Sequence, residues 1–420
     1  METDNLKYLV LLRWDKITWY AYGALTASLA QHGIPFEVFK GDAISTIQNW
    51  VSQGYKVIYG ESSRNMTING LEKRLRSMSK SFDATDVISV IGGPQATGDP
   101  LPILEFGANY VIMGEGEVTF PELIQFILDH KFTPDLSPQI PGLAYLTATD
   151  EFVCTPSRSR IDLNKFCPYS IKGTFPLHPP IEIMRGCAFR CRFCQAPHMY
   201  GNPKFRSLDT ILKIVDHYYE YFHPLKQQVD IRFIAPNALG YMEKTRGKPN
   251  IPALKELVHR IKEYDVRIFL GTFPSEVRPE YVTEDIISIF TEVDNSQLSV
   301  GFQSGSDRIL HDMRRGHTVE AGMKAYDILT SNGFTPVFDF ILGTPTETED
   351  DQWETLRLMR ELGKKARVRL HYFMPLTGTP WAKEKPVPLY PNVHSEIGRL
   401  AHDEIISGDF DRQILLSKTK

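Results

Sequence analysis

Three cysteines close together are the residues of this chain with the clearest capacity for chemistry. Cys187, Cys191 and Cys194 stand in the segment MRGCAFRCRFCQAP, with three residues between the first two and two between the last two. Thiolates on one loop can each bind one iron of an iron–sulfur cluster, which normally has four cysteine ligands. No fourth cysteine lies nearby, so one iron of a [4Fe–4S] cluster would be left open to a ligand. The spacing therefore predicts a catalytic cluster.

Two simpler interpretations compete. A zinc site could use His198 as a fourth ligand, but zinc sites usually show two ligand pairs separated by a longer spacer. The cysteines could also be unrelated core residues. Arg185, Arg190 and Arg192 make the segment too polar for that. We expect their charges to lower the pKa values of the thiols and to offset the negative charge of a cluster.

The cysteine loop, with Phe193 before its last cysteine, resembles the signature of the radical S-adenosylmethionine (radical SAM) superfamily. Later segments resemble further blocks of that superfamily: GFQSGSDRIL (301–310), MRRGHT (313–318), DFILGTPTET (339–348) and FMPLTGTPWA (373–382). The resemblance implies that the open iron binds the amino and carboxylate groups of SAM. It also implies that an external one-electron reductant, such as flavodoxin or ferredoxin, triggers cleavage of SAM to a 5′-deoxyadenosyl radical.

The same resemblance suggests the other residues around SAM. The usual second-strand "GGE" is replaced by IAPNALGY (234–241), so Pro236 is a candidate near the SAM amine, beside Asn237. Gln303, Ser304 and Arg315 are candidates for its carboxylate and ribose, together with Phe193 on the cluster loop. Ser304 could instead cap a turn, and Arg315 could pair with a carboxylate.

Two tyrosines are predicted to face the substrate as catalytic residues. Tyr241 follows the second strand of the second half, and Tyr372 lies in its last strand. Packing is the alternative for both, because most of the 18 tyrosines should be packing or surface residues.

The first third of the chain carries glycine-rich segments where strands are predicted to end. Glycines at such positions let the backbone approach a ligand. There is no G-x-G-x-x-G at the first turn and no P-loop. The segments GGPQAT and GEGEVTF resemble the cobalamin-binding domain that precedes many radical SAM domains. The cofactor-binding residues implied are Ser62, Ser63, Gly92, Gly93, Pro94, Gln95, Thr97, Gly114, Gly116 and Glu117.

That resemblance has one departure. The DxHxxG motif that supplies a lower cobalt ligand is absent, and the first loop (13–19) has no histidine. If cobalamin binds, we therefore expect no histidine side chain on the lower face of cobalt.

Alternating strand and helix patterns position these residues. Strands are predicted at 7–14, 36–41, 55–62, 86–94 and 109–117, with helices at 21–32, 71–82, 102–106 and 120–131. This predicts an α/β fold with a doubly wound, Rossmann-like sheet. Six further strands, at 181–186, 229–236, 266–273, 296–304, 334–343 and 366–375, alternate with helices at 208–222, 252–264, 283–290, 319–332 and 348–362. They predict a partial (βα)₆ barrel, smaller than a closed eight-unit barrel.

The predicted domains are a cobalamin-binding domain (1–140), a hairpin and proline-rich linker (141–179), a radical SAM partial barrel (180–383) and a C-terminal helical extension (384–420).

Composition limits the partners. The net charge of −4 gives no general attraction to nucleic acid or anionic lipid. No run of about 18 apolar residues predicts a membrane span. The N-terminus METDNLKYLV lacks a secretory pattern, and five cysteines are too few for a disulfide framework. We therefore expect a cytoplasmic protein.

Together the two resemblances imply a cobalamin-dependent radical SAM C-methyltransferase. Such an enzyme abstracts a hydrogen atom from an unactivated carbon and transfers a methyl group from methylcobalamin to it. The substrate would be a protein side chain or a small molecule. The compact size is similar to that of archaeal relatives that modify methyl-coenzyme M reductase, which suggests a glutamine or arginine.

Other functions stay open. One is rearrangement or carbon–carbon coupling without methyl transfer. Another is tRNA methylthiolation, although no cysteine precedes Cys154 and the last 37 residues are not strongly basic. A non-enzymatic carrier would require the SAM-type blocks to be accidental.

Overall fold

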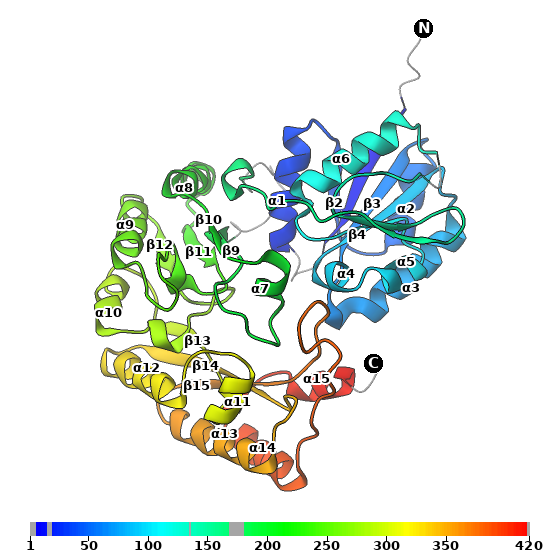
Figure 1. The fold of residues 1–420 in the computed structure, drawn as a ribbon. Coiled ribbons are helices and arrows are strands. Elements are labelled where there is room, and N and C mark those ends of the chain that lie inside the picture. Colours follow the sequence, from blue (N-terminus) through cyan, green and yellow to red (C-terminus); the bar gives the residue numbers. More distant parts are fainter. Residues whose placement is uncertain (1–5, 15–18, 134–135, 168–179, 418–420) are drawn as a thin grey trace. The chain divides into compact units, whose positions relative to one another are not determined.

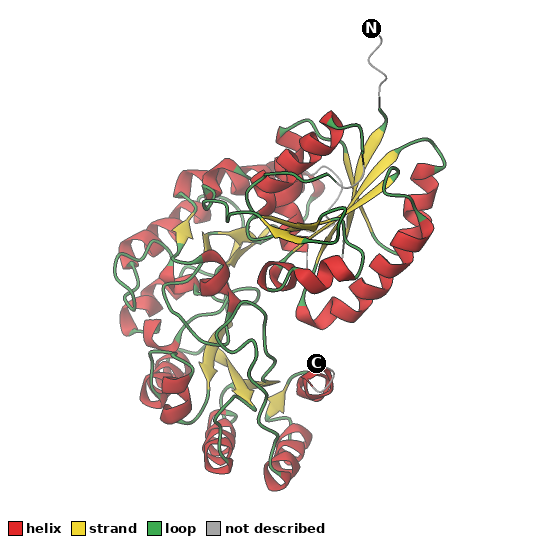
Figure 2. Ribbon diagram, turned by 45° about the vertical axis from the view of Figure 1, so that its right-hand side comes forward, coloured by secondary structure: helices red, strands yellow, loops and turns green. Residues whose placement is uncertain are grey.

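The computed structural model describes residues 6–14, 19–133, 136–167 and 180–417, and the chain divides into two compact units, 1–179 and 180–420 (Figure 1). Each unit has its own sheets and its own helices (Figure 2).

The first unit is built on one seven-stranded sheet of order β2-β1-β3-β4-β5-β6-β7. Strands β1 to β5 are parallel, and β6 and β7 are antiparallel. The strands are β1 (Tyr8–Arg13), β2 (Phe36–Phe39), β3 (Lys56–Ser62), β4 (Val87–Gly92), β5 (Tyr110–Ile112), β6 (Leu143–Leu146) and β7 (Phe152–Cys154). The helices are α1 (Trp19–Gln31), α2 (Ala43–Val51), α3 (Ile68–Ser81), α4 (Pro94–Gly98), α5 (Leu101–Glu105) and α6 (Gly116–Asp129).

Alternation along β1 shows why this sheet is covered on both faces. Val10 and Leu12 belong to the apolar cluster that includes residues of α1 and α6, whereas Leu9 and Leu11 belong to the cluster formed with α2 and α3. Successive side chains of a strand point to opposite faces, so a strand that is apolar throughout needs helices on both. The predicted doubly wound, Rossmann-like fold is confirmed.

Two features differ from the predictions. The predicted hairpin is present as β6 and β7, but it pairs with β5 and extends the sheet, so residues 143–154 belong to the first unit rather than to a segment between the domains. Helix α2 falls where no element is predicted, and the Asp42 side chain caps it by accepting a hydrogen bond from the Ser45 N–H (2.8 Å). Residues 168–179 of the predicted linker lie outside the described residues.

The second unit holds a three-stranded sheet, β12-β11-β8, and a four-stranded sheet, β13-β14-β15-β16. An isolated parallel bridge between Val277 and Val300 links the chain after β12 to β13. The strands are β8 (Ile181–Glu182), β11 (Asp230–Ile234), β12 (Arg267–Phe269), β13 (Gln297–Gln303), β14 (Thr335–Leu342), β15 (Arg367–Tyr372) and β16 (Ile406–Ser407). A separate antiparallel pair is formed by β9 (Met184–Arg185) and β10 (Lys204–Phe205).

Helices cover the outer side of these strands (Figure 1). The longer ones are α8 (Leu208–Phe222), α9 (Ile251–Lys262), α12 (Val319–Ser331), α13 (Glu349–Leu362) and α14 (Pro391–His402). The short helices are α7 (Gln195–Tyr200), α10 (Glu284–Phe290), α11 (Asp307–Asp312) and α15 (Phe410–Ser417). The parallel strands alternate with helices as the predicted partial barrel requires.

The rings of Phe302, Phe338 and Phe340 pack together, and a Cβ on Gly322 of α12 would collide with Phe302. The alternate residues of these strands, such as Gly301 and Asp339, therefore face the opposite side, which we call the lumen.

The predicted C-terminal extension is part of this unit's fold. Strand β16 continues the four-stranded sheet beside β15, and Gln413 of α15 accepts a hydrogen bond from the Tyr372 N–H (2.7 Å). Among the described residues, no helix is long and apolar enough to cross a membrane.

Candidate functional site

The three cysteines lie on the loop that joins β9 to α7, and backbone bonds fix that loop. The Cys187 N–H donates to the Gly201 carbonyl (3.0 Å), and the Cys194 N–H donates to the Cys191 carbonyl (3.3 Å). Burial raises the pKa of the Cys187 thiol, and it raises that of Cys194 to about 12. The neighbouring Cys191 raises both pKa values further, so the thiols lie near one another.

The surroundings of Cys191 suit an anionic group. Arg315 Nη1 lies 3.5 Å and Arg278 Nη1 3.9 Å from its Sγ atom, and all three residues are buried. Guanidinium groups stay charged in proteins, and positive charge beside thiolates stabilises them. His198 is not aimed at the thiols, because its Nε2 contacts the Cys191 carbonyl oxygen (3.1 Å). Among the described residues, no three or more His, Cys, Asp or Glu side chains are grouped to hold a single metal ion.

The arginines nearest in sequence are occupied elsewhere. Arg185 forms two hydrogen bonds with Glu182 (2.8 and 2.7 Å), Arg190 donates to the Pro197 carbonyl (2.9 Å), and Arg192 pairs with Asp312. The prediction that these three arginines lower the thiol pKa values is therefore wrong. Long-range folding brings other arginines to the cysteines, and the pKa of both Cys187 and Cys194 is raised.

Arg278 is one functional candidate that the sequence analysis missed. Its guanidinium stacks on the ring of Phe189 at 3.4 Å from the ring centre, and its Nε donates to Glu280 (2.6 Å). Burial and the nearby Arg315 lower its pKa. Its segment has no recognised motif and no periodic pattern. The only sequence signal is an arginine in the mostly apolar stretch VRPEYV (277–282).

Three side chains converge over Gly301 of β13. A Cβ on Gly301 would lie 2.7 Å from Gln303 Nε2 and 3.1 Å from both Arg315 Nη2 and Glu276 Oε2. Gln303 has a positive φ of 81° at an irregularity in the β13–β14 pairing. Such a conformation is uncommon for a non-glycine residue and often marks a functional site. The structure thus brings together two predicted residues, Gln303 and Arg315, and adds Glu276.

Pro236 and Phe193 lie around this group without a polar role of their own. Pro236 is half-buried just after β11, next to Asn237, whose Oδ1 accepts a hydrogen bond from the Arg278 N–H (3.2 Å). The Phe193 ring is 5.9 Å from the Arg315 guanidinium carbon. Asn237 thus helps to position Arg278.

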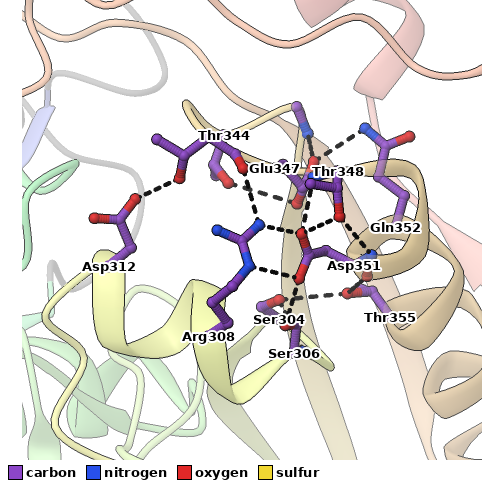
Figure 3. Close-up of polar contacts among 12 residues, drawn as sticks. Ser304, Ser306, Arg308, Asp312, Thr344, Glu347, Thr348, Asp351, Gln352 and Thr355 are labelled. Atoms are coloured by element: carbon purple, nitrogen blue, oxygen red, sulfur yellow. Dashed lines mark hydrogen bonds and ion pairs between the residues drawn. The ribbon is translucent and has the colours of Figure 1, made fainter.

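Ser304 has structural partners. Its Oγ accepts a hydrogen bond from the Ser306 N–H (3.2 Å) and contacts Thr355 Oγ1 (3.3 Å). Figure 3 shows Ser304 at the edge of a polar group in which Ser306 and Arg308 bind the Asp351 carboxylate. Ser304 therefore caps a turn, the alternative noted in the sequence analysis, and its binding role stays a prediction.

Both predicted tyrosines are buried with their hydroxyls engaged. The Tyr241 hydroxyl donates to the Arg206 carbonyl (2.9 Å), and the Tyr372 hydroxyl donates to the Val387 carbonyl (3.0 Å). Burial raises the pKa of each. The Tyr372 ring lies against Gly343, whose Cβ would be 2.3 Å from it. The packing alternative describes these contacts, and a catalytic role for either stays a prediction.

In the first unit, the loops after β3 and β4 interlock. Ser63 Oγ donates to the Gly92 carbonyl (3.0 Å) and accepts from the Ala96 N–H (2.9 Å). Gly93 has a φ of 94°, and a Cβ there would be 2.5 Å from Ser62 Oγ. Only glycine fits this turn, which begins α4, the helix that contains Pro94 and Gln95.

The loop after β5 joins the same edge of the sheet. Thr97 Oγ1 donates to the Gly93 carbonyl (2.9 Å) and accepts from the Gly114 N–H (3.0 Å). A Cβ on Gly114 would meet nothing within 4 Å, so the backbone there borders open space. Gly116 and Glu117 begin α6, where the Glu117 carbonyl accepts a bond from Ser28 Oγ and the Glu117 side chain is buried. The predicted residues of the first unit are thus gathered at one edge, and their ligand stays a prediction.

A family model matches most of the second unit, and curated relatives match a little over half of the chain. Residues 181–359 match the model described as Radical SAM superfamily, so this unit carries a radical SAM domain. A tRNA-2-methylthio-N(6)-dimethylallyladenosine synthase of Syntrophobacter fumaroxidans is 30% identical over 255 residues, 59% of this chain and 52% of that protein. The enzyme of the same name from Thermus thermophilus is 31% identical over 229 residues, which are 53% of this chain and 45% of that enzyme. The chain spans about half the length of these relatives.

Solved structures share the fold over nearly the whole chain. One is the radical SAM methyltransferase TsrM from Kitasatospora setae, with cobalamin and a [4Fe-4S] cluster bound, at a TM-score of 0.70 and 17% sequence identity. The match covers 90% of this chain and 74% of the TsrM chain. The cobalamin-dependent radical SAM enzyme OxsB, with aqua-cobalamin bound, has a TM-score of 0.67, with 15% identity and coverages of 95% and 56%. This chain therefore has the fold of cobalamin-dependent radical SAM enzymes.

Proposed function

We propose that this chain is a cobalamin-dependent radical SAM methyltransferase that removes a hydrogen atom from an unactivated carbon and places a methyl group there. One observation carries the proposal: a single chain combines a glycine-lined sheet edge with three cysteines beside two buried guanidinium groups. The fold shared with TsrM and OxsB supports it, because those proteins hold cobalamin.

In the second unit, each proposed role follows from the chemistry of a side chain. Cys187, Cys191 and Cys194 would hold a [4Fe–4S] cluster, and Arg278 and Arg315 would offset its negative charge. Gln303 and Glu276 lie over Gly301 beside Arg315, where amide, carboxylate and guanidinium can bind the polar groups of SAM. When bound, the cluster and SAM supply a carbon radical, and methylcobalamin supplies the methyl group.

In the first unit, the backbone would hold cobalamin. The fixed turn at Gly93 and the open space beside Gly114 allow a large flat ligand to approach the sheet edge. Ser62 Oγ and Thr97 Oγ1 lie next to these glycines. The corresponding loop after β1 falls largely on residues 15–18, outside the described residues, so the predicted lack of a lower histidine ligand stays a prediction.

A hollow beside the cluster loop suits an acidic electron donor. It has a volume of about 480 Å³, and its lining includes Phe189, Arg190, Arg246 and Arg314. The Arg246 guanidinium lies 5.4 Å from the Phe189 ring centre. The guanidinium of Arg278, which contacts Cys191, stacks on the same ring. We assign this basic hollow to flavodoxin or ferredoxin, because opposite charge guides such partners together.

The substrate proposed first is a glutamine or arginine side chain of methyl-coenzyme M reductase. The test uses the anaerobically reconstituted chain, deuterated-methyl SAM and peptides containing either residue. Methyl transfer to carbon predicts label on a product carbon, with S-adenosylhomocysteine and 5′-deoxyadenosine both formed. No label on carbon in any product, with both cofactors loaded, would contradict the proposal.

Methylthiolation of tRNA is a second candidate, favoured by the names of the curated relatives. It predicts a methylthio group on adenosine when unmodified tRNA replaces the peptide. The same assay detects rearrangement or coupling, which would give 5′-deoxyadenosine without S-adenosylhomocysteine.

A further inference from the structure

A second pocket of the barrel lies away from the cysteine loop. It has a volume of about 530 Å³ and is lined along the amino-terminal halves of β13, β14 and β15 by residues such as Gln297, Val337 and Arg367. The chain leaves the sheet after β12 and returns only at Val277, so the pocket lies where β12 and β13 are not paired.

Three arginines line this pocket, and no carboxylate does. They are Arg232 of β11 and Arg367 and Arg369 of β15. Two carboxylates neutralise part of the charge: Asp339 pairs with Arg369, and Asp230 lies 3.8 Å from Arg232 while forming its shorter contact with Arg267 (2.6 Å). The three arginines of the pocket therefore share two carboxylates, one of which is also paired with Arg267, and this leaves an excess of positive charge at the pocket.

Some N–H donors of these arginines also lack a hydrogen-bond partner among the described residues. Within the described part of the chain, the side chain of Arg367 has no hydrogen bond or ion pair, and the residue is exposed. The Nε of Arg369 is buried without a partner among those residues. Ser299 lines the same pocket and adds a hydroxyl. Arginine forks bind carboxylate and phosphate oxygens in pairs, so these groups can hold an oxyanion.

One wall of the pocket is aromatic. The Arg232 guanidinium stacks on Phe269 at 4.0 Å from the ring centre, and Phe273 is 65% exposed. An exposed phenylalanine in a pocket that three arginines also line offers a surface for a flat apolar group attached to the anion.

We propose that this pocket binds an anionic group, a phosphate or a carboxylate, carried on a flat apolar moiety. The site is separate from the cysteines, and it does not depend on which reaction the cluster performs.

Isothermal titration calorimetry on the full-length, cluster-loaded chain tests this with phenyl phosphate, benzoate, inorganic phosphate and phenol. Phenyl phosphate or benzoate should bind, phenol should not, and binding should weaken as salt rises. The stronger of the two anions identifies the anionic group. Equal binding of inorganic phosphate and phenyl phosphate would assign the site to phosphate alone and contradict the apolar wall.

Variants locate the site. Arg367→Gln and Arg232→Gln should each weaken binding about tenfold, the loss expected for one charge-assisted hydrogen bond. Arg357→Gln is the matched control, because Arg357 is an exposed arginine of α13 outside the pocket. Thermal unfolding checks that each variant is folded. Unchanged binding in both pocket variants, or no saturable binding of any anion to the wild-type chain, would overturn the proposal.

Discussion

The two candidate ligand regions are built from different materials. At the sheet edge of the first unit, backbone and small residues make the surface, and the hydroxyls of Ser63 and Thr97 are used to tie one loop to the next. At the cysteine loop of the second unit, charged side chains such as Arg278 and Arg315 make the surface. A backbone surface depends on shape, whereas a surface of charged side chains depends on electrostatics.

This difference predicts which substitutions should disrupt each region. Adding a side chain should weaken ligand binding at the backbone surface, whereas removing a cluster ligand or a charge should weaken cofactor binding at the cysteine loop. The predictions below use that contrast, beginning with the removal of a proposed ligand.

Replacing Cys191 with serine should abolish the cluster, because only three cysteines are available on the loop and thiolate is the iron ligand. Bound iron and SAM cleavage should both fall to background, measured by iron analysis, electron paramagnetic resonance and chromatography. Cys154→Ser is the control, since Cys154 is exposed on β7 and should leave both unchanged. A Cys191→Ser variant that keeps a full cluster would exclude the proposed ligand set.

Replacing Arg315 with methionine should slow SAM cleavage by about 10–100-fold, the usual cost of losing a partner of a metal ligand. It should also make the cluster potential more negative, because a positive charge next to Cys191 is lost. Potentiometric titration followed by electron paramagnetic resonance measures this shift, and Arg315→Lys should restore part of it. Arg192→Met is the control, because it removes the same charge from a side chain that pairs with Asp312. Equal shifts in both variants would mean that nearness in sequence matters more than the observed geometry.

The contrast between the regions also shows what could be predicted from sequence. Helix α8 was predicted with its observed bounds from its helical spacing, and the structure adds the Ser207 cap at its start. The gathering of Gly93, Thr97 and Gly114 was also predicted, since the ends of parallel strands meet at one edge of a sheet. A sequence can therefore predict features that depend on a local helical pattern or on the order of parallel strands.

The positions of the missed residues depend on an irregular path of the chain between two strands. Arg278 and Glu276 reach the site because the chain leaves the sheet after β12 and returns at Val277, and no periodic pattern encodes that path. The same limit explains the error about Arg190 and Arg192. Nearness in sequence places them beside the cysteines, but their side chains find partners elsewhere.

Adding one methyl group at Gly93 should damage the first unit. In Gly93→Ala, the Cβ would lie 2.5 Å from Ser62 Oγ at a φ of 94°, and such strain costs about 1–3 kcal/mol. Cobalamin retained after desalting, measured by absorbance, should fall more than the cluster content. Gly398→Ala is the control, because a Cβ in that helix meets nothing within 4 Å. Full cobalamin retention in a folded Gly93→Ala variant would argue against a ligand surface made of backbone.

Reversing charge in the basic hollow should affect only the protein-driven reaction. Arg246→Glu should lower the rate with reduced flavodoxin several-fold at low salt and leave the dithionite-driven rate unchanged, since the variant alters docking and not the cluster. Arg357→Glu makes the same charge change outside the hollow. Equal loss with both reductants would assign Arg246 to the site itself.

The last prediction concerns stability and not a ligand, at the polar group of Figure 3. Burial raises the pKa of Glu347 to about 7 although the Gly343 N–H and Gln352 donate to its carboxylate. The folded state therefore holds a proton that the unfolded state releases near the ordinary glutamate pKa of 4.5. The stabilisation is complete below that value and is lost as pH rises through about 7, by up to roughly 3 kcal/mol. Thermal unfolding between pH 5 and 8 should show this decline, and Glu347→Gln should flatten it because glutamine does not titrate. An equal slope in the wild-type chain and the variant would mean that Glu347 is already ionised in the fold, in which case its hydrogen bonds outweigh its burial.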